Sequence, residues 1–214
     1  SGRFQQGLFL PGEGHIDNRA LLASLEDTLV CRGVEWLSGC PVTEVAPGRI
    51  QTAAGARPFD WVFDCRGYGA RNDIPGLRGV RGELIYLNAP DVELLRPVRL
   101  MHPRYPLYIV PRDENLYVVG ATSIESNDRG AITVRSELEL LSAAYTLHPG
   151  FGEARILETC ANLRPALPDH LPRIMREQGL IRMNGLYRHG FLVGPELAQR
   201  TADMVSWKYE LTET

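Results

Sequence analysis

The feature that most constrains the fold of this chain is the order in which its hydrophobic patterns follow one another. Apolar residues recur at helical spacing from Leu21 to Val30, within a stretch that otherwise alternates short strand-like runs and turns. Between residues 80 and 121 only strand-like runs appear, separated by Gly and Pro. A helical pattern follows at Thr133–Leu147, and the remainder mixes helix and strand again. This order predicts an α/β fold with an α+β insertion, in which a mainly antiparallel sheet domain interrupts an α/β domain.

We place the interrupted α/β domain at residues 1–78 and 162–214, and the antiparallel domain at residues 79–161. Asp17 or Asn18 can begin the first helix, because their side chains accept hydrogen bonds from its first amides. Turn residues between neighbouring runs indicate two hairpins, at residues 42–52 and 107–121. The other expected elements are strands at 34–37, 59–65, 82–87, 98–101, 156–163 and 180–184, and a last helix at about 196–208.

The composition is that of an ordinary globular protein, with 214 residues, 44% hydrophobic and 23% charged, and a formal net charge of −3. This balance argues against a nucleic-acid partner, which requires a basic surface. The widely spaced cysteines Cys31, Cys40, Cys65 and Cys160 argue against a metal site and a disulfide framework. We expect reduced, mostly buried thiols in a cytoplasmic protein. No apolar run approaches membrane-spanning length, so we expect no membrane partner.

One strand-like run ends in a glycine-containing turn. The mostly apolar run Phe59–Cys65 continues directly into Arg66–Ala70, which contains two glycines. Open α/β sheets bind ligands at the carboxyl ends of their strands, so this turn is a candidate ligand site. By itself the signal has low specificity.

Five segments together resemble, in order and spacing, the FAD-dependent amino-acid oxidase family that includes glycine oxidase and D-amino-acid oxidase. The segments are Leu10–Arg19, Asp64–Ala70, Tyr108–Arg112 with Val118–Thr122, Leu163–Asp169 and Asn184–Pro195. Each one alone is weakly specific, and five in register across most of the chain are a strong signal. The resemblance is to the C-terminal part of the family.

The resemblance implies the oxidation of glycine, N-methylglycine or a small D-amino acid by hydride transfer to flavin. Arg164 would bind the substrate carboxylate, Tyr108 would donate its hydroxyl to it, and Arg188 would lie at the flavin edge or the substrate. The residues implied in FAD binding are Val42, Cys65, Gly67, His189, Gly190, Phe191 and Leu192. Structural alternatives remain open: a strand-end ion pair for Arg164, a half-buried strand aromatic for Tyr108, and a solvated loop for Arg188 and His189.

Departures from the family pattern bear on partners and activity. The chain has no strand, glycine fingerprint and helix of the kind that binds the ADP half of FAD. We therefore expect a fragment, or a subunit completed by a second chain or by self-association. Arg66 replaces a small residue, Leu186 replaces a His, and Ser123 stands where some members are apolar. A non-catalytic carboxylate-binding or partner protein derived from the family is the alternative.

Overall fold

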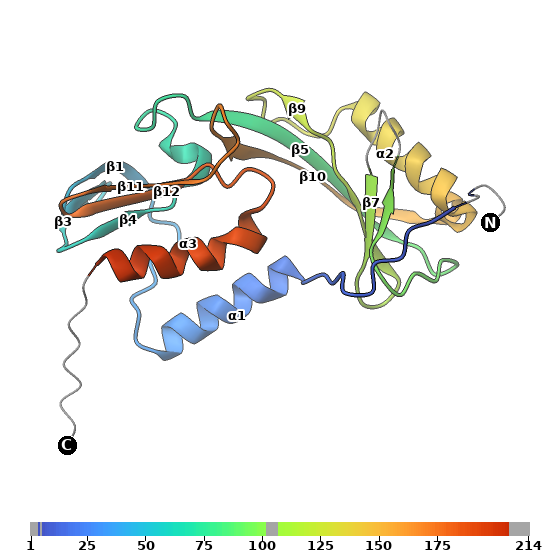
Figure 1. Cartoon of the computed structure of the whole chain (residues 1–214), viewed down its shortest axis with the longest axis horizontal. Helices are drawn as coiled ribbons and strands as arrows, with labels where there is room; N and C mark the ends of the chain where they lie inside the picture. The colour runs from blue at the N-terminus through green and yellow to red at the C-terminus, as the bar shows by residue number, and fades with distance from the viewer. Residues whose placement is uncertain (1–3, 5, 102–106, 206–214) are drawn as a thin grey trace, which may run out of the picture. The chain divides into compact units, whose positions relative to one another are not determined.

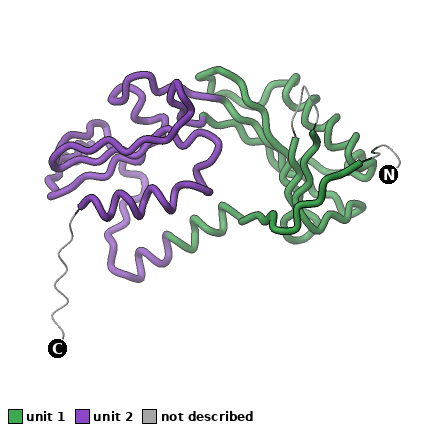
Figure 2. Tube along the Cα trace, in the orientation of Figure 1, with its two compact units in different colours: residues 1–25, 81–163 green, residues 26–80, 164–214 purple. Residues whose placement is uncertain are grey.

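The structure is a computed structural model that describes residue 4 and residues 6–101 and 107–205. The chain divides into two compact units, shown in different colours in Figure 2. Unit 1 contains residues 1–25 and 81–163, and unit 2 contains residues 26–80 and 164–214. The domain division predicted from sequence, with one domain at residues 1–78 and 162–214 and the other at residues 79–161, stays a prediction. The mixed α/β architecture with antiparallel sheets agrees with the predicted fold class.

The large sheet of unit 1 is antiparallel wherever its register is defined in the described residues. Its strand order is β10-β5-β8-β7-β6, and β9 pairs with β5. The strands are β5 (Arg78–Asn88), β6 (Val98–Leu100), β7 (Leu107–Pro111), β8 (Leu116–Gly120), β9 (Ile124–Glu125) and β10 (Arg155–Ala166). Strands β7 and β8 form the predicted hairpin, with Pro111 opposite Tyr117 beside the turn.

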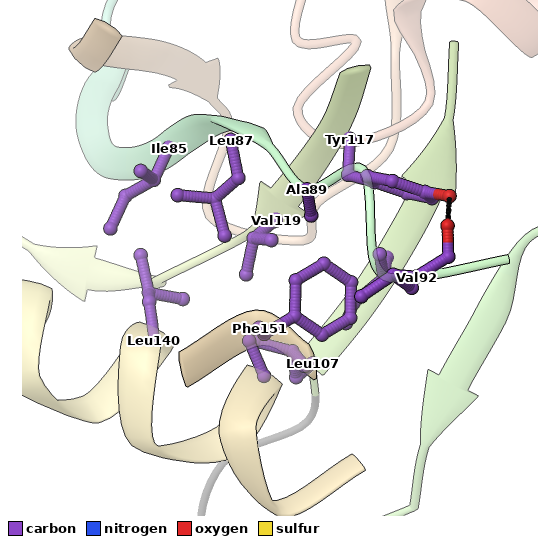
Figure 3. Packing of buried hydrophobic residues seen from close by; sticks show 11 residues of the cluster. Ile85, Leu87, Ala89, Val92, Leu107, Tyr117, Val119, Leu140 and Phe151 are labelled. Atoms are coloured by element: carbon purple, nitrogen blue, oxygen red, sulfur yellow. Dashed lines mark hydrogen bonds between the residues drawn. The ribbon is translucent and has the colours of Figure 1, made fainter. Parts of the chain in front are cut away.

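The core of unit 1 lies on the face of this sheet that α2 (Val134–Leu147) and the short 3₁₀ helix η2 (Pro149–Glu153) cover (Figure 1). Side chains alternate between the two faces of a strand, so every second residue of β5, β7 and β8 points into this core. Figure 3 shows this packing, with the Tyr117 hydroxyl donating to the Val92 carbonyl. The core includes Ile85, Leu87, Leu107, Ile109, Tyr117, Val119, Leu140, Ala144 and Phe151.

Helix α2 begins where the sequence predicted a helix. Thr133 is the residue before its first turn, and its hydroxyl accepts a hydrogen bond from the Ser136 amide at 3.2 Å. This bond satisfies one of the amides that a helix start leaves without a partner. Leu140 and Ala144 stand one turn apart on the buried face, as the periodicity of the sequence requires.

Residues 6–25 also belong to unit 1, and ion pairs fix them to the sheet. Arg112, just after β7, donates to the Ile16 carbonyl at 3.1 Å and contacts His15 Nδ1 at 2.8 Å. Arg99 on β6 lies 2.8 Å from the Glu13 carboxylate. Because these charges come from strands far along the chain, they fix a turn-rich segment that has little regular structure of its own.

A further cation fixes the start of α1 (Asn18–Cys31), which crosses from unit 1 into unit 2. Arg19 donates two hydrogen bonds to Glu158, at 2.9 and 2.7 Å, and lies 4.4 Å from the centre of the Tyr86 ring. These bonds, and to a smaller extent a hydrogen bond from the Cys160 thiol, lower the pKa of Glu158 to about 2. Tyr86 alternates with Ile85 and Leu87, so Arg19 lies on the face opposite α2.

Unit 2 contains two three-stranded sheets in its described residues. One is a meander of β1 (Val42–Ala46), β2 (Arg49–Thr52) and β3 (Gly55–Pro58). The other, in the order β11-β12-β4, consists of β4 (Val62–Asp64), β11 (Arg173–Glu177) and β12 (Leu180–Asn184), and β12 runs parallel to β4. A small apolar cluster of Val45, Val62 and Leu180 joins the two sheets. The remaining elements are the 3₁₀ helix η1 (Gly67–Ala70) and the helix α3 (Gly190–Met204).

Several local expectations are wrong. Residues 34–37 form no strand, and their apolar side chains are about half exposed. The last helix begins at Gly190 rather than near residue 196, and its predicted end at Lys208 lies outside the described residues. The thiols are free, but they are not mostly buried. Cys31, Cys40 and Cys65 are exposed and Cys160 is half-buried.

Candidate functional site

Three segments distant in sequence meet in unit 2, at the carboxyl ends of β4 and β12. The two strands are parallel, with Arg182 opposite Asp64, so the turns that follow them emerge at the same edge. The Asn184 side-chain amide donates to the Gly67 carbonyl at 2.9 Å. The Tyr187 amide donates to the Pro165 carbonyl at 3.0 Å, which adds the end of β10 to the group. The candidate turn, the Arg164–Pro165 segment and the loop after β12 therefore form one cluster.

Two glycines make this close approach possible. Gly67 has φ +55°, and a Cβ added there would lie 3.7 Å from Pro165 Cγ. Gly185 has φ +80°, and a Cβ there would lie 2.7 Å from Leu167 Cδ1. Residues with a side chain rarely adopt such φ values, and at Gly185 the space is also filled. The glycines thus set the path of both turns.

A buried carboxylate organises the first turn. Asp64 is fully buried at the end of β4, and Arg66 donates to both of its oxygens at 2.8 Å. Arg66 also donates to Asp73 at 2.6 Å. Burial raises the pKa of Asp64, but hydrogen bonds from Arg66 outweigh this effect and lower it below its ordinary value of 3.8. Arg66, which departs from the family pattern, therefore stabilises a buried negative charge two residues before it.

The first turn of α3 supplies the other part of the candidate site. Helix α3 begins at Gly190, and the side chain of His189, the residue before it, makes no capping hydrogen bond to the first turn. A Cβ added at Gly190 would meet nothing within 4 Å, and the side chains of Phe191 and Leu192 are 50% and 79% exposed. The predicted loop at residues 190–195 is thus a helix N-terminus, which carries a partial positive charge and free amide donors.

Val42 lies in a different part of unit 2. It is half-buried at the start of β1 and lines a hollow of about 280 Å³. The hollow is mostly apolar, with one acidic and one basic residue at its edge, and its lining is Val42, Val45, Ile50, Phe59, Trp61, Val62, Phe63, Asp64 and Arg66. Asp64 and Arg66 therefore border both this hollow and the turn described above.

Tyr108 belongs to unit 1, on the face of the sheet opposite α2. It is half-buried and directly opposite Gly120 in the β7–β8 ladder. A Cβ added at Gly120 would lie 2.9 Å from the Tyr108 hydroxyl and 3.0 Å from its ring carbon Cζ. The ring therefore lies across β8, in space that only a glycine leaves open.

The two candidate arginines differ in exposure. Arg164 is half-buried near the end of β10, where it has an interaction partner within the protein. Arg188 and His189 are exposed, immediately before α3. Cys65 is exposed as well, after β4, and Asp64 is next to it. The structure thus groups Cys65, Gly67, Arg164 and residues 188–192 in unit 2, whereas their roles stay predictions.

Sequence reasoning missed the residues that hold these turns. Asp64 was visible as a charge within an apolar run that ends in an arginine, which is a signal for a buried ion pair. Asn184 and Gly120 gave no comparable signal, because their roles depend on partners far along the chain. Among the described residues, no group of histidine, cysteine or acidic side chains is suited to a metal ion. No helix in the described ranges is long and apolar enough to cross a membrane.

Comparison with known proteins gives the family. The chain matches the model of the DAO family, described as FAD dependent oxidoreductase, over residues 1–204. It is 48% identical over 202 residues to a Rhizobium etli protein named "Putative thiamine biosynthesis oxidoreductase ThiO", which covers 94% of this chain and 58% of that protein. It is 26% identical over 214 residues to the glycine oxidase of Geobacillus kaustophilus, covering 94% and 56% of the two chains.

The similarity extends to solved structures. The crystal structure of the Geobacillus kaustophilus glycine oxidase has a TM-score of 0.79 at 27% identity, over 91% of this chain and 55% of that one. The iminodiacetate oxidase of Chelativorans sp. BNC1 has a TM-score of 0.69 at 26% identity, over 84% and 52%. The chain thus spans little more than half the length of these relatives. Since the family model covers most of its residues, the chain belongs to the DAO family of FAD-dependent oxidoreductases.

Proposed function

We propose that this chain is part of an FAD-dependent oxidoreductase that oxidises glycine, N-methylglycine or a small D-amino acid. The observation that supports this most directly is the cluster at the carboxyl ends of β4 and β12, which unites three of the five segments that resemble the family. Family membership supports the cofactor. The names of two relatives, glycine oxidase and thiamine biosynthesis oxidoreductase, support the substrate class and a role in thiamine biosynthesis.

The described residues fit a flavin. The uncapped first amides of α3 and the open space at Gly190 suit an electron-rich oxygen of a planar ring. The exposed Phe191 and Leu192 offer apolar surface beside them. Cys65, Gly67 and His189 would contribute to the same site, and Val42 would contact the cofactor from β1. When bound, FAD would accept the hydride from the substrate Cα and pass the electrons to oxygen or another acceptor.

The protein's own task is to hold the substrate. Arg164 binds the carboxylate with its two parallel donors, because a guanidinium matches a carboxylate in shape as well as charge. Tyr108 donates its hydroxyl to the same group, and Arg188 contacts the substrate or the flavin edge. No side chain has to remove a proton from Cα, because the free amine form loses a hydride directly. The oxidised product is an imine, which water converts to the oxo acid and an amine or ammonia.

A second polypeptide segment is part of the proposal. Within the described residues, β4 pairs only with β12, so its other edge has no strand partner. Phe63, the middle residue of β4, is 39% exposed. Free strand edges and exposed apolar side chains favour pairing with another chain. We propose that a segment equivalent to the rest of the relatives' length, on this or another polypeptide, covers this edge and holds the ADP half of FAD.

The experiment joins this chain to the part of the Rhizobium etli relative outside the matched region and assays hydrogen peroxide with glycine and sarcosine. We expect peroxide from the joined protein, and Arg164→Lys should raise KM strongly, because one point charge replaces two parallel donors. Arg49→Lys, in an exposed ion pair of β2, is the matched control and should leave KM unchanged. A flavin-loaded protein that oxidises none of these amines, with oxygen or an artificial acceptor, would contradict the proposal and support a carboxylate-binding role.

A further inference from the structure

A buried polar network in unit 1 has no role in the chemistry described above. Arg81 and Glu83 on β5 are 2% and 0% exposed, and Arg81 Nε donates to Glu83 Oε1 at 2.8 Å. Arg81 also donates to the carbonyls of Asp128 at 2.9 Å and Ala131 at 2.6 Å. Buried charges are costly unless they are paired, and both backbone carbonyls that Arg81 reaches lie in the segment after β8, so the pair holds β5 to that segment.

The second oxygen of Glu83 reaches that segment directly. Thr122 Oγ1 donates to Glu83 Oε2 at 2.9 Å and accepts a hydrogen bond from the Glu83 amide at 2.9 Å. The Thr122 amide donates to the Glu83 carbonyl at 3.1 Å. Burial raises the pKa of Glu83, but hydrogen bonds from Ser136, Arg81 and Thr122 outweigh it and lower the pKa, so the side chain is a carboxylate.

Thr122 lies where the regular β5–β8 ladder has ended. The last ladder pair is Leu84 with Gly120. Beyond it, the Glu83 amide donates its hydrogen bond to the Thr122 hydroxyl instead of to a backbone carbonyl. Three hydrogen bonds between two residues thus fix the end of β8 to β5. Gly120, two residues earlier, is the residue across which the Tyr108 ring lies.

We propose that Thr122, held by Glu83, is a positioning residue for Tyr108. The bonds to Glu83 fix the position of the β8 backbone at Gly120 relative to β5. The Tyr108 ring packs against the backbone of Gly120, so its position depends on that of β8. The inference rests on the proposed role of Tyr108 in holding the substrate carboxylate. Such a role matters because a misplacement of about 1 Å at a substrate-holding group can slow catalysis about a hundredfold.

The test follows the Tyr108 ring directly, by ¹⁹F NMR of the chain labelled with 3-fluorotyrosine. The sequence contains eight tyrosines, and Tyr108→Phe and Tyr117→Phe assign two of the signals. Thr122→Val replaces the hydroxyl with a methyl group of similar size and so removes its two hydrogen bonds to Glu83, and we expect the Tyr108 signal to shift or broaden. Tyr117 lies on β8 as well but points into the α2 core, so its signal should stay in place.

Two further variants make the result decisive. Thr122→Ser retains the hydroxyl and should restore the Tyr108 signal, whereas Glu83→Asp retains the charge but withdraws it from Thr122 and should displace that signal. Thr146→Val is the matched control, because the Thr146 hydroxyl bonds only its own helix in the described contacts. An unmoved Tyr108 signal in both Thr122→Val and Glu83→Asp would overturn the proposal, as would equal shifts of Tyr108 and Tyr117.

The readout also separates this inference from the proposed function. The response of Tyr108 to Thr122 requires neither flavin nor substrate, so it can hold even if the joined protein proves inactive. If Tyr108 responds to Thr122→Val but Tyr108→Phe leaves the KM for glycine unchanged in the joined protein, the positioning holds and the substrate role of Tyr108 is wrong.

Discussion

At the scale of single residues, two buried carboxylates determine how the turns of this protein are held. Asp64 in unit 2 and Glu83 in unit 1 are each paired with an arginine two positions away in the sequence. In both cases hydrogen bonds offset the cost of burial and keep the acid ionised. Removing one member of such a pair should therefore cost more than the pair itself contributes, because the other charge stays buried.

Arg66→Ala tests this in unit 2. Asp64 is fully buried, so the variant leaves it with Arg182 as the nearest remaining cation, at 3.6 Å. We expect the free energy of unfolding to fall by about 3 kcal/mol, measured by urea denaturation. Arg49→Ala removes an exposed ion pair with Glu44 and should change it by less than about 1 kcal/mol. Equal losses in the two variants would contradict the proposed role of Arg66.

The dependence of stability on pH follows from the lowered pKa of Asp64. An acid whose pKa is lower in the folded protein binds protons more readily when unfolded, so its contribution is complete above the ordinary value of 3.8 and is lost below it. We expect Asp64→Asn to be less stable than the natural protein at about pH 7 and at about pH 5 by the same amount. The difference should shrink as the pH falls below 3.8. A difference that shrinks already above about pH 5 would show that another group is responsible.

Gly120→Ala tests the packing of Tyr108. The added methyl group would lie 2.9 Å from the phenol oxygen, so the ring has to move away. Because the ring is half-buried and can tilt outward, the stability cost should be only about 1 kcal/mol. In the joined protein the KM for glycine should rise, because the phenol loses its position. Gly14→Ala, where nothing lies within 4 Å, is the control and should change neither stability nor KM.

At the scale of helices and strands, the sequence predicted the elements that depend on neighbouring residues, such as turns and helical spacing, rather than on distant strands. Both hairpins are where turn residues placed them, and helix α2 is where apolar residues at helical spacing placed it. The strand expected at 34–37 is absent, because its apolar side chains have no neighbouring strand to pack on among the described residues. Strand β11 was missed, since its Arg- and Glu-containing run lacks an alternating pattern and depends on pairing with β12.

The start of α3 shows a second limit of sequence reasoning. Two glycines and Pro195 indicate a loop, yet the chain becomes helical at Gly190 with Pro195 inside the helix. A proline there sacrifices one backbone hydrogen bond, which packing elsewhere can offset. The candidate site was predictable as a set of segments, because each retains family residues. Its contacts, such as Asn184 with Gly67, depend on long-range pairing and could not be read from the sequence.

Helix α2 offers a prediction at this scale. Thr133→Ala removes the side-chain acceptor for the Ser136 amide, so the free energy of unfolding should fall by about 1 kcal/mol in urea denaturation. Thr133→Ser retains the oxygen and should keep nearly all of the stability. Thr146→Ala, an exposed change near the end of the same helix, should cause no loss, since alanine favours helix. A loss in Thr146→Ala as large as in Thr133→Ala would rule out capping as the cause.

At the scale of the whole molecule, this chain spans 58% of its Rhizobium etli relative and leaves apolar surface exposed. Helix α1 has no buried residues, although Leu22, Leu25 and Leu29 recur along it at helical spacing. The residues that we propose for contact with the flavin ring are in unit 2, whereas no glycine fingerprint for its ADP half is found in the sequence. Cofactor affinity should therefore depend on the segment that joins this surface.

We predict that the chain by itself binds FAD weakly and is purified without visible flavin absorbance. Joined to the remaining part of the Rhizobium etli relative, it should be purified with bound FAD, because the ring site and the ADP site then act on one ligand and their free energies combine. Gly190→Val, which fills the open space before α3, should lower the FAD content of the joined protein, whereas Gly14→Ala should not. Calorimetric titration of the lone chain with FAD provides the affinity. Tight binding there would mean that the described residues suffice for the cofactor, and that the exposed face of α1 serves another purpose.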